Sequence, residues 1–290
     1  MEAMLFGAGS HLGVQTDGAA FGAEHLTRDL PGLERRLLMQ DLTIEKSHDP
    51  LDLRKNEAAL NAYNERMYRT ILPEVEAGRF PILLGGDHSV AIASALASQQ
   101  VQGPLGIIWI DAHTDFNTFD TTETGNIHGL PLAAITGYDC ADLRRFHAGS
   151  PIHVQRAVVV RARSVDDDEW TNIEDAGLTV FTTEDIQREG VEAIMEKAFR
   201  IAGEGTNGIH ISYDLDVIDP QVAPGVSVPE QEGISEAEAF AVSRYITEHI
   251  DQVRSFDLVE LNPLRDVDGR TEAIAARILR EVAEAAKGKE

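Results

Sequence analysis

The 290-residue chain has a single cysteine, Cys140, so no disulfide can form within it, as is usual for proteins of the reducing cytoplasm. It has no apolar run of the roughly 18 residues that a membrane helix needs, and its first residues do not resemble a signal peptide. Basic residues are also scarce: 25 Lys and Arg stand against 49 Asp and Glu, a formal charge of −24. We therefore expect a soluble, cytoplasmic protein that binds small cations and neither nucleic acid nor membranes.

The chain lacks internal repeats, low-complexity segments and Pro/Gly/Ser-rich linkers, so residues 1–290 are expected to form a single domain. Apolar residues recurring three and four positions apart predict helices, and Ser235 followed by Glu238 is a capping-box pattern that predicts the start of one. Short apolar runs predict buried parallel strands at 4–6, 81–84, 105–110, 157–160, 179–181, 208–212 and 255–261. This alternation predicts a three-layer α/β/α fold with a mostly parallel central sheet.

Acidic and imidazole side chains follow four of the predicted strands, at the carboxyl ends where ligands gather in such sheets. Residues two apart in an extended chain point to the same face, which groups the side chains of 111, 113 and 115 and those of 214 and 216. If these strand ends are neighbours, the side chains converge on one site. The candidate ligands are His88, Asp111, His113, Asp115, Asp214 and Asp216.

Four carboxylates and two imidazoles at one site predict a pair of divalent cations, because crowded carboxylates repel one another unless they are neutralised. The oxygen-rich ligand set favours Mn²⁺ or Mg²⁺ over zinc, and the imidazoles favour Mn²⁺. Two such ions can lower the pKa of a water molecule bound between them. A single DxD or DxH pair also occurs in helix caps and hydrated loops. Three such elements, each after an apolar strand, favour the metal site.

Nearby residues of the same segments receive other interpretations. His210 lies deeper in its predicted strand and is expected to be a hydrogen-bonded core histidine. Trp109 is expected to pack in the core, and Asp87 is a candidate for orienting His88, since metal-bound histidines need such a partner.

The motifs, taken together, resemble the ureohydrolase family, which contains arginases and agmatinases. They are GGDHS at 85–89, DAHTD at 111–115, SYDLDVIDP at 212–220 and APG at 223–225, and the resemblance extends from residue 6 to residue 263. It implies an arginase-like fold, a homo-oligomer (trimer or hexamer) and two Mn²⁺ ions held by the six candidate ligands. This ligand set agrees with the one that the spacing predicts.

The same resemblance implies roles for residues outside the ligand set. Asn117 and Thr124 would hold a substrate α-carboxylate with Asn126 beside them, and Asp166 would contact the α-amino group. Glu260 would pair with the guanidinium, His128 would transfer a proton to the leaving amine, and Asp115 would accept a proton. The chain departs from the family pattern at Thr124 (usually Ser), in the segment 163–169, which reads RSVDDDE where the pattern is RDVDP, and at Glu232 (usually Gly).

These features predict hydrolysis of L-arginine to L-ornithine and urea by a dinuclear manganese enzyme. Agmatinase or another guanidino-acid hydrolase is the alternative within the family; agmatine lacks the carboxylate that the loop at 117–126 would bind. A dimetal phosphoesterase is more remote, because those enzymes place DxH before GD and have contiguous Asn and His, whereas Ile127 separates Asn126 from His128 here. A non-catalytic metal-binding scaffold is a further alternative, against which His128 and Glu260 argue.

Overall fold

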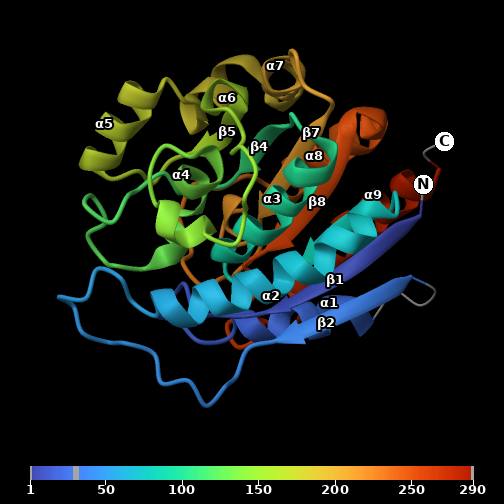
Figure 1. Cartoon of the computed structure of the whole chain (residues 1–290). Coiled ribbons are helices and arrows are strands. Elements are labelled where there is room, and N and C mark those ends of the chain that lie inside the picture. Colours follow the sequence, from blue (N-terminus) through green and yellow to red (C-terminus); the bar gives the residue numbers. More distant parts are fainter. Residues whose placement is uncertain (1, 29–32, 289–290) are drawn as a thin grey trace.

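A parallel eight-stranded β-sheet forms the centre of the computed structural model, which describes residues 2–28 and 33–288 (Figure 1). Neighbouring strands follow the order β2-β1-β3-β8-β7-β4-β5-β6, and every pairing between them is parallel. The strands are β1 (Ala3–Gly9), β2 (Glu34–Met39), β3 (Phe80–Leu84), β4 (Gly106–Ile110), β5 (Ala157–Ala162), β6 (Thr179–Thr182), β7 (Ile209–Asp214) and β8 (Val253–Val259).

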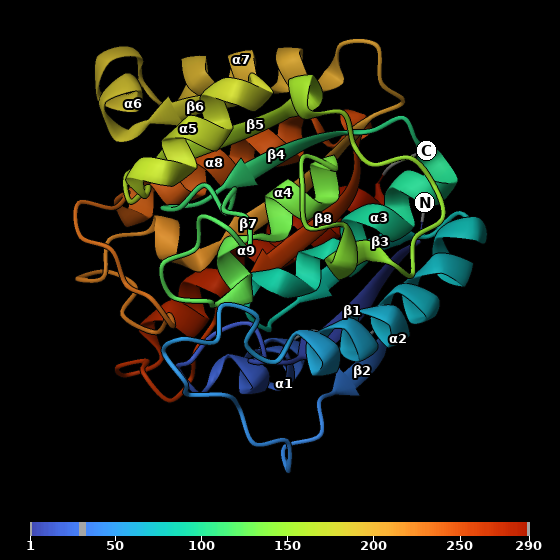
Figure 2. The same cartoon turned by 60° about the vertical axis from the view of Figure 1, so that its left-hand side comes forward.

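Helices cover both faces of this sheet, which confirms the predicted three-layer fold (Figure 2). One apolar layer includes α2 (Glu57–Glu76), α3 (Ala91–Gln102), α4 (Pro131–Thr136) and α5 (Asp167–Ala176). The other includes α1 (Gly22–Arg28), α6 (Thr183–Glu189), α7 (Val191–Gly203), α8 (Glu236–Glu248) and α9 (Arg270–Lys287). No helix within residues 2–28 and 33–288 has both the length and the apolar character needed to cross a bilayer.

Strand β2 is the one strand that the sequence pattern did not predict. It lies at the edge of the sheet, pairs with β1 alone, and its side chains are exposed or half-exposed. Its sequence, ERRLLM, begins with three charged residues, so it lacks the apolar run that marks the buried strands. The predicted cap of α8 is confirmed: Ser235 accepts a hydrogen bond from the backbone of Glu238, which reaches back to Ser235.

The four central strands bring the polar segments together, because β3, β8, β7 and β4 are consecutive neighbours with their carboxyl ends at one edge. After β3 the chain turns sharply at Gly85 and Gly86, whose φ angles are 72° and 80°. A Cβ atom on Gly85 would lie 2.3 Å from the backbone nitrogen of Ala23, so only glycine fits this turn. The turn directs His88 toward the ends of β4 and β7.

Candidate metal centre and active site

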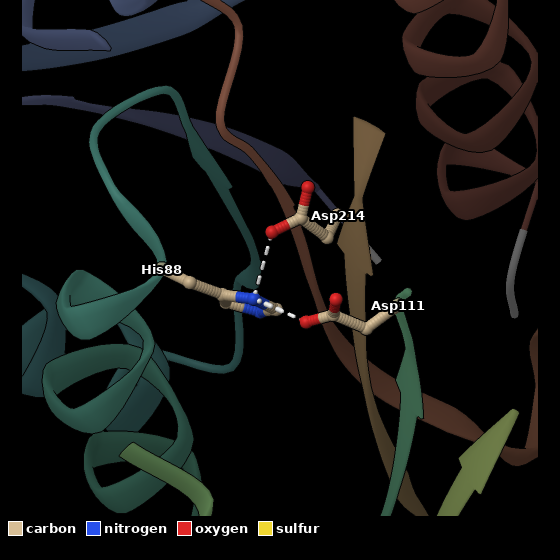
Figure 3. A group of neighbouring side chains, drawn as sticks. All are labelled: His88, Asp111 and Asp214. Atoms are coloured by element: carbon tan, nitrogen blue, oxygen red, sulfur yellow. Dashed lines mark ion pairs between the residues drawn. The ribbon is translucent and has the colours of Figure 1, made fainter. Parts of the chain in front are cut away.

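His88 lies at the centre of a fully buried cluster of carboxylates. Its Nδ1 atom is 2.9 Å from Asp111 Oδ2, at the end of β4, and 3.0 Å from Asp214 Oδ2, at the end of β7 (Figure 3). Asp115 Oδ2 lies 3.2 Å from the same nitrogen. His88, Asp111 and Asp214 are placed so that one ion can contact all three, and we call them the inner ligand group.

A second set of ligands shares Asp111 with the first. His113 Nδ1 lies 3.0 Å from Asp216 Oδ2 and 3.4 Å from Asp111 Oδ1. We call Asp111, His113 and Asp216 the outer ligand group, because the His113 side chain is 21% exposed whereas that of His88 is 0% exposed. All six ligand candidates from the sequence therefore lie together, with Asp111 between the two groups.

The chemistry of this cluster fits divalent cations. His88 Nδ1 is buried and makes no hydrogen bond to any described residue, although three carboxylate oxygens surround it. Burial and the neighbouring carboxylates of Asp216 and Asp111 raise the pKa of Asp214 well above its usual value. Burial and Asp111 likewise raise the pKa of Asp216 to about 6. Such crowding is costly unless cations neutralise it, and imidazole nitrogen with carboxylate oxygen is a ligand set that Mn²⁺ accepts.

Two residues that the sequence analysis did not assign to the site hold the inner ligand group in place. Ser212 Oγ lies 2.8 Å from His88 Nε2, on the side of the ring opposite the carboxylates. Trp109 stacks on His88 with ring centroids 3.8 Å apart, and its Nε1 donates a hydrogen bond to Asp111 Oδ2 at 2.9 Å. Each lies two residues before a ligand along the chain, Trp109 before Asp111 and Ser212 before Asp214, so the alternation that predicts the ligands also applies to these partners.

The sequence makes Asp87 a candidate for orienting His88, but in the structure Asp87 does not contact the His88 ring. Its carboxylate accepts hydrogen bonds from the backbone nitrogens of Ser89, at 3.1 Å, and Gly13, at 3.0 Å, and so fixes the turn after β3. His210 is the buried, hydrogen-bonded histidine that the sequence predicts: its ring nitrogens lie 2.7 Å from Ser255 Oγ and 3.0 Å from Asp257 Oδ2.

A cavity of about 230 Å³ opens beside the outer ligand group. It contains most of the residues to which the family resemblance assigns substrate contacts or proton transfer. Its lining includes His113, Asp115, Asn117, Thr124, Asn126, His128, Ser164, Asp166, Glu169, Val228 and Glu230. The structure thus gathers residues from four separate segments around one small polar space.

Hydrogen bonds pre-order the part of the cavity assigned to the substrate carboxylate and amine. Asn117 Nδ2 donates to Asp166 Oδ2 at 3.0 Å, which joins two segments that are 49 residues apart. Thr124 Oγ1 accepts from the backbone nitrogen of Asn126 at 3.2 Å, and the ammonium of Lys55 binds the Thr124 carbonyl. Thr124 and Asp166 are both exposed at the cavity wall, so their polar atoms are accessible to a ligand.

Glu260 lies behind His128 and does not itself line the cavity. Its Oε1 accepts a hydrogen bond from the backbone nitrogen of His88 at 2.8 Å and lies 3.4 Å from His128 Nδ1. Burial opposes the charged forms of both residues, but their mutual attraction outweighs it. The pKa of His128 is therefore raised and the pKa of Glu260 is lowered. Glu260 has a φ of 67° and Asp115 a φ of 50°, a strained conformation that is concentrated at functional sites.

Glu169, which the sequence analysis did not single out, braces the loop that carries Asp115. Its Oε1 accepts from the backbone nitrogen of Phe116 at 2.7 Å and from the Thr114 hydroxyl, and its Oε2 accepts from the backbone nitrogen of Asp166 at 3.3 Å. Burial raises the pKa of Glu169 to about 7 despite these donors. The capping-box spacing from Asp166 to Glu169 at the start of α5 is the sequence signal that marks it.

The Arginase family model matches residues 1–284. The chain belongs to this family. It is 35% identical to an arginase of Bacillus caldovelox, over 81% of this chain and 79% of that protein, and 37% identical to an arginase of Brevibacillus brevis, over 76% and 74%. The crystal structure of the B. caldovelox arginase superimposes with a TM-score of 0.89 and 32% identity, covering 98% of each chain. Membership of the arginase family supports a divalent metal site in this cluster.

Proposed function

We propose that the protein is an arginase, which hydrolyses L-arginine to L-ornithine and urea with one catalytic domain spanning residues 1–290. The observation that carries this proposal is the cavity, which joins the outer ligand group to the neutral donors of Asn117, Thr124 and Asn126. Neutral hydrogen-bond donors suit the α-carboxylate of an amino acid. The relatives with the matching sequence and fold are named arginases.

Two Mn²⁺ ions would be held by the inner and outer ligand groups together with Asp115, which faces His88 Nδ1. When bound, such ions supply Lewis-acid charge and lower the pKa of water, which provides a nucleophile for the poorly electrophilic guanidinium carbon. Because Asp111 belongs to both groups, it would help to hold both ions.

The protein's own residues orient the substrate and move its protons. Asn117, Thr124 and Asn126 bind the α-carboxylate, and Asp166 binds the α-ammonium group. Glu260 lies directly behind His128 at the cavity wall, and the family resemblance assigns its carboxylate to the guanidinium NH groups. Asp115 accepts a proton, and the imidazole of His128 at the cavity wall, whose pKa is raised beside Glu260, donates one to the leaving amine.

The alternatives within and outside the family are less well supported. Agmatine has no carboxylate for Asn117 and Thr124 to bind, and membership of the arginase family argues against a phosphoesterase. A non-catalytic scaffold would have no use for the buried pair of His128 and Glu260 beside the cavity. The cytoplasmic location and the homo-oligomeric assembly, trimer or hexamer, stay predictions from the sequence and its family resemblance.

Urea release tests this proposal directly. The Mn²⁺-loaded protein is assayed in parallel with L-arginine, agmatine and 4-guanidinobutyrate, and with an aryl phosphate for the phosphoesterase alternative. We expect arginine to be preferred by as much as about 10⁴-fold, because unpaired polar donors reject a substrate that lacks its carboxylate. Glu260→Gln is the matched control, which should bind Mn²⁺ normally and lose urea release. Equal rates with arginine and agmatine would refute the choice of substrate.

A further inference from the structure

The ring of His113 faces acidic groups on both sides. Its Nδ1 points to Asp216 and Asp111 of the outer ligand group, and its Nε2 lies 3.7 Å from Glu230 Oε1. The Glu230 side chain is 34% exposed and lines the same cavity. Because Glu230 approaches the nitrogen that points away from the outer ligand group, it contacts the ligand residue without joining the ligand set.

The backbone of Glu230 is fixed relative to the outer ligand group by a single guanidinium. Arg163 Nη2 donates to the carbonyl of Asp216 at 2.7 Å and to the carbonyl of Glu230 at 3.0 Å. Arg163 Nε also donates to the carbonyl of Gln231 at 2.9 Å. The loop that carries Glu230 and the turn that carries Asp216 are therefore held together, although they are separated along the chain.

A histidine that binds metal through Nδ1 must carry its proton on Nε2. A carboxylate at Nε2 selects this tautomer, orients the ring and makes the other nitrogen a stronger ligand. From this geometry we infer that Glu230 is a positioning residue for His113, whose carboxylate strengthens cation binding at the outer ligand group. The 3.7 Å separation between His113 Nε2 and Glu230 Oε1 is an ion-pair distance, at which the carboxylate favours a proton on that nitrogen.

The inference rests on the proposed metal centre and is tested without substrate. Mn²⁺ binding is followed by calorimetry and metal analysis in the wild type and in Glu230→Gln. We expect the affinity for one of the two ions to fall by about 10- to 100-fold while the other is unchanged. Glu232→Gln is the matched control, since it removes the same charge from an exposed position of the same loop and should leave both affinities unchanged. Undiminished affinity in Glu230→Gln would overturn the inference.

A double-mutant cycle separates an effect through His113 from simple loss of negative charge. In a His113→Asn background, Glu230→Gln should weaken Mn²⁺ binding no further; an equal loss in both backgrounds would overturn the proposal. A higher KM for arginine with unaltered Mn²⁺ affinity would also overturn it and assign Glu230 to the substrate ammonium. Asp216→Asn separates failure of the proposed metal centre from failure of the role given to Glu230. If Asp216→Asn retains both ions, the proposed metal centre is refuted. If it loses one ion, the metal centre stands and the Glu230 variant tests only the role of Glu230.

Discussion

The inner and outer ligand groups are built from similar side chains but are supported by different parts of the molecule. His88 is 0% exposed, stacks on Trp109 and contacts the hydroxyl of Ser212 on a central strand. His113 is 21% exposed and its outer nitrogen faces Glu230 on a loop at the cavity wall. The comparison shows that the sheet core fixes one half of the site, whereas loops that also shape the substrate cavity fix the other.

The largest effect is expected from the residue that both groups share. Asp111→Asn removes a charge from each group and breaks the contact between Asp111 and both histidines. We expect binding of both Mn²⁺ ions to weaken by about 100-fold or more, with urea release lost in parallel. Asp214→Asn and Asp216→Asn are the matched controls, each of which should weaken one ion more than the other. If Asp111→Asn retains one ion at full affinity, the two groups do not share this ligand.

His128 tests whether proton transfer is separable from cation binding. His128→Asn removes the partner of Glu260 and should slow turnover by about 10²-fold, with Mn²⁺ content unchanged. Glu260 helps to raise the pKa of His128 above 6.5. The imidazole is therefore protonated below about pH 6.5, and it loses its proton as the pH rises through the raised pKa. The advantage of the wild type over the variant should therefore narrow toward alkaline pH. A pH-independent ratio would contradict proton donation by His128.

Ser212 provides the counterpart of Glu230 on the inner side. Ser212→Ala leaves His88 Nε2 buried without its partner, which lies 2.8 Å away in the wild type. We expect about 10-fold weaker binding at the inner ligand group and a loss of about 1–3 kcal/mol in the free energy of unfolding of the metal-free protein. Thermal and urea denaturation measure the second effect, which Glu230→Gln should not show because Glu230 is partly exposed. Equal destabilisation by both variants would remove the distinction between core and loop.

The sequence predicts the ligands of both groups but not the loop residue that supports His113, for a physical reason. Ligands at the ends of buried strands follow an alternation that the apolar runs make visible, so the positions of Asp111 and Asp214 could be inferred from spacing. Loops have no such period. Arg163 holds Glu230 at the cavity by donating hydrogen bonds to the carbonyls of Asp216 and Glu230. Nothing in the sequence pattern indicates this long-range contact. The edge strand β2 was missed because its exposure leaves it without an apolar pattern.

Glu169 gives the smallest and most specific test of the loop side. Burial raises its pKa from 4.5 to about 7 in the folded protein, so between these values the folded state binds more protons than the unfolded state. The contribution of Glu169 to the free energy of unfolding should therefore decrease as pH rises from about 4.5 to about 7 and be constant above that. Glu169→Gln removes this titration, and relative to the variant the wild type should lose on the order of 1–3 kcal/mol over the interval.

Urea denaturation of the metal-free proteins at both ends of this pH interval measures the difference in the free energy of unfolding between the wild type and Glu169→Gln. The metal ligands titrate in both proteins, so their contribution cancels in this difference. Parallel pH dependence in the two proteins would mean that Glu169 keeps its ordinary pKa of 4.5 in the folded protein and is charged over most of the interval. The bonds from Phe116 and Thr114 to Glu169 would then be charge-assisted at acidic pH as well. In that case the loop that carries Asp115 would be held as firmly as the inner ligand group, and the contrast between the two halves would be confined to His113 and Glu230.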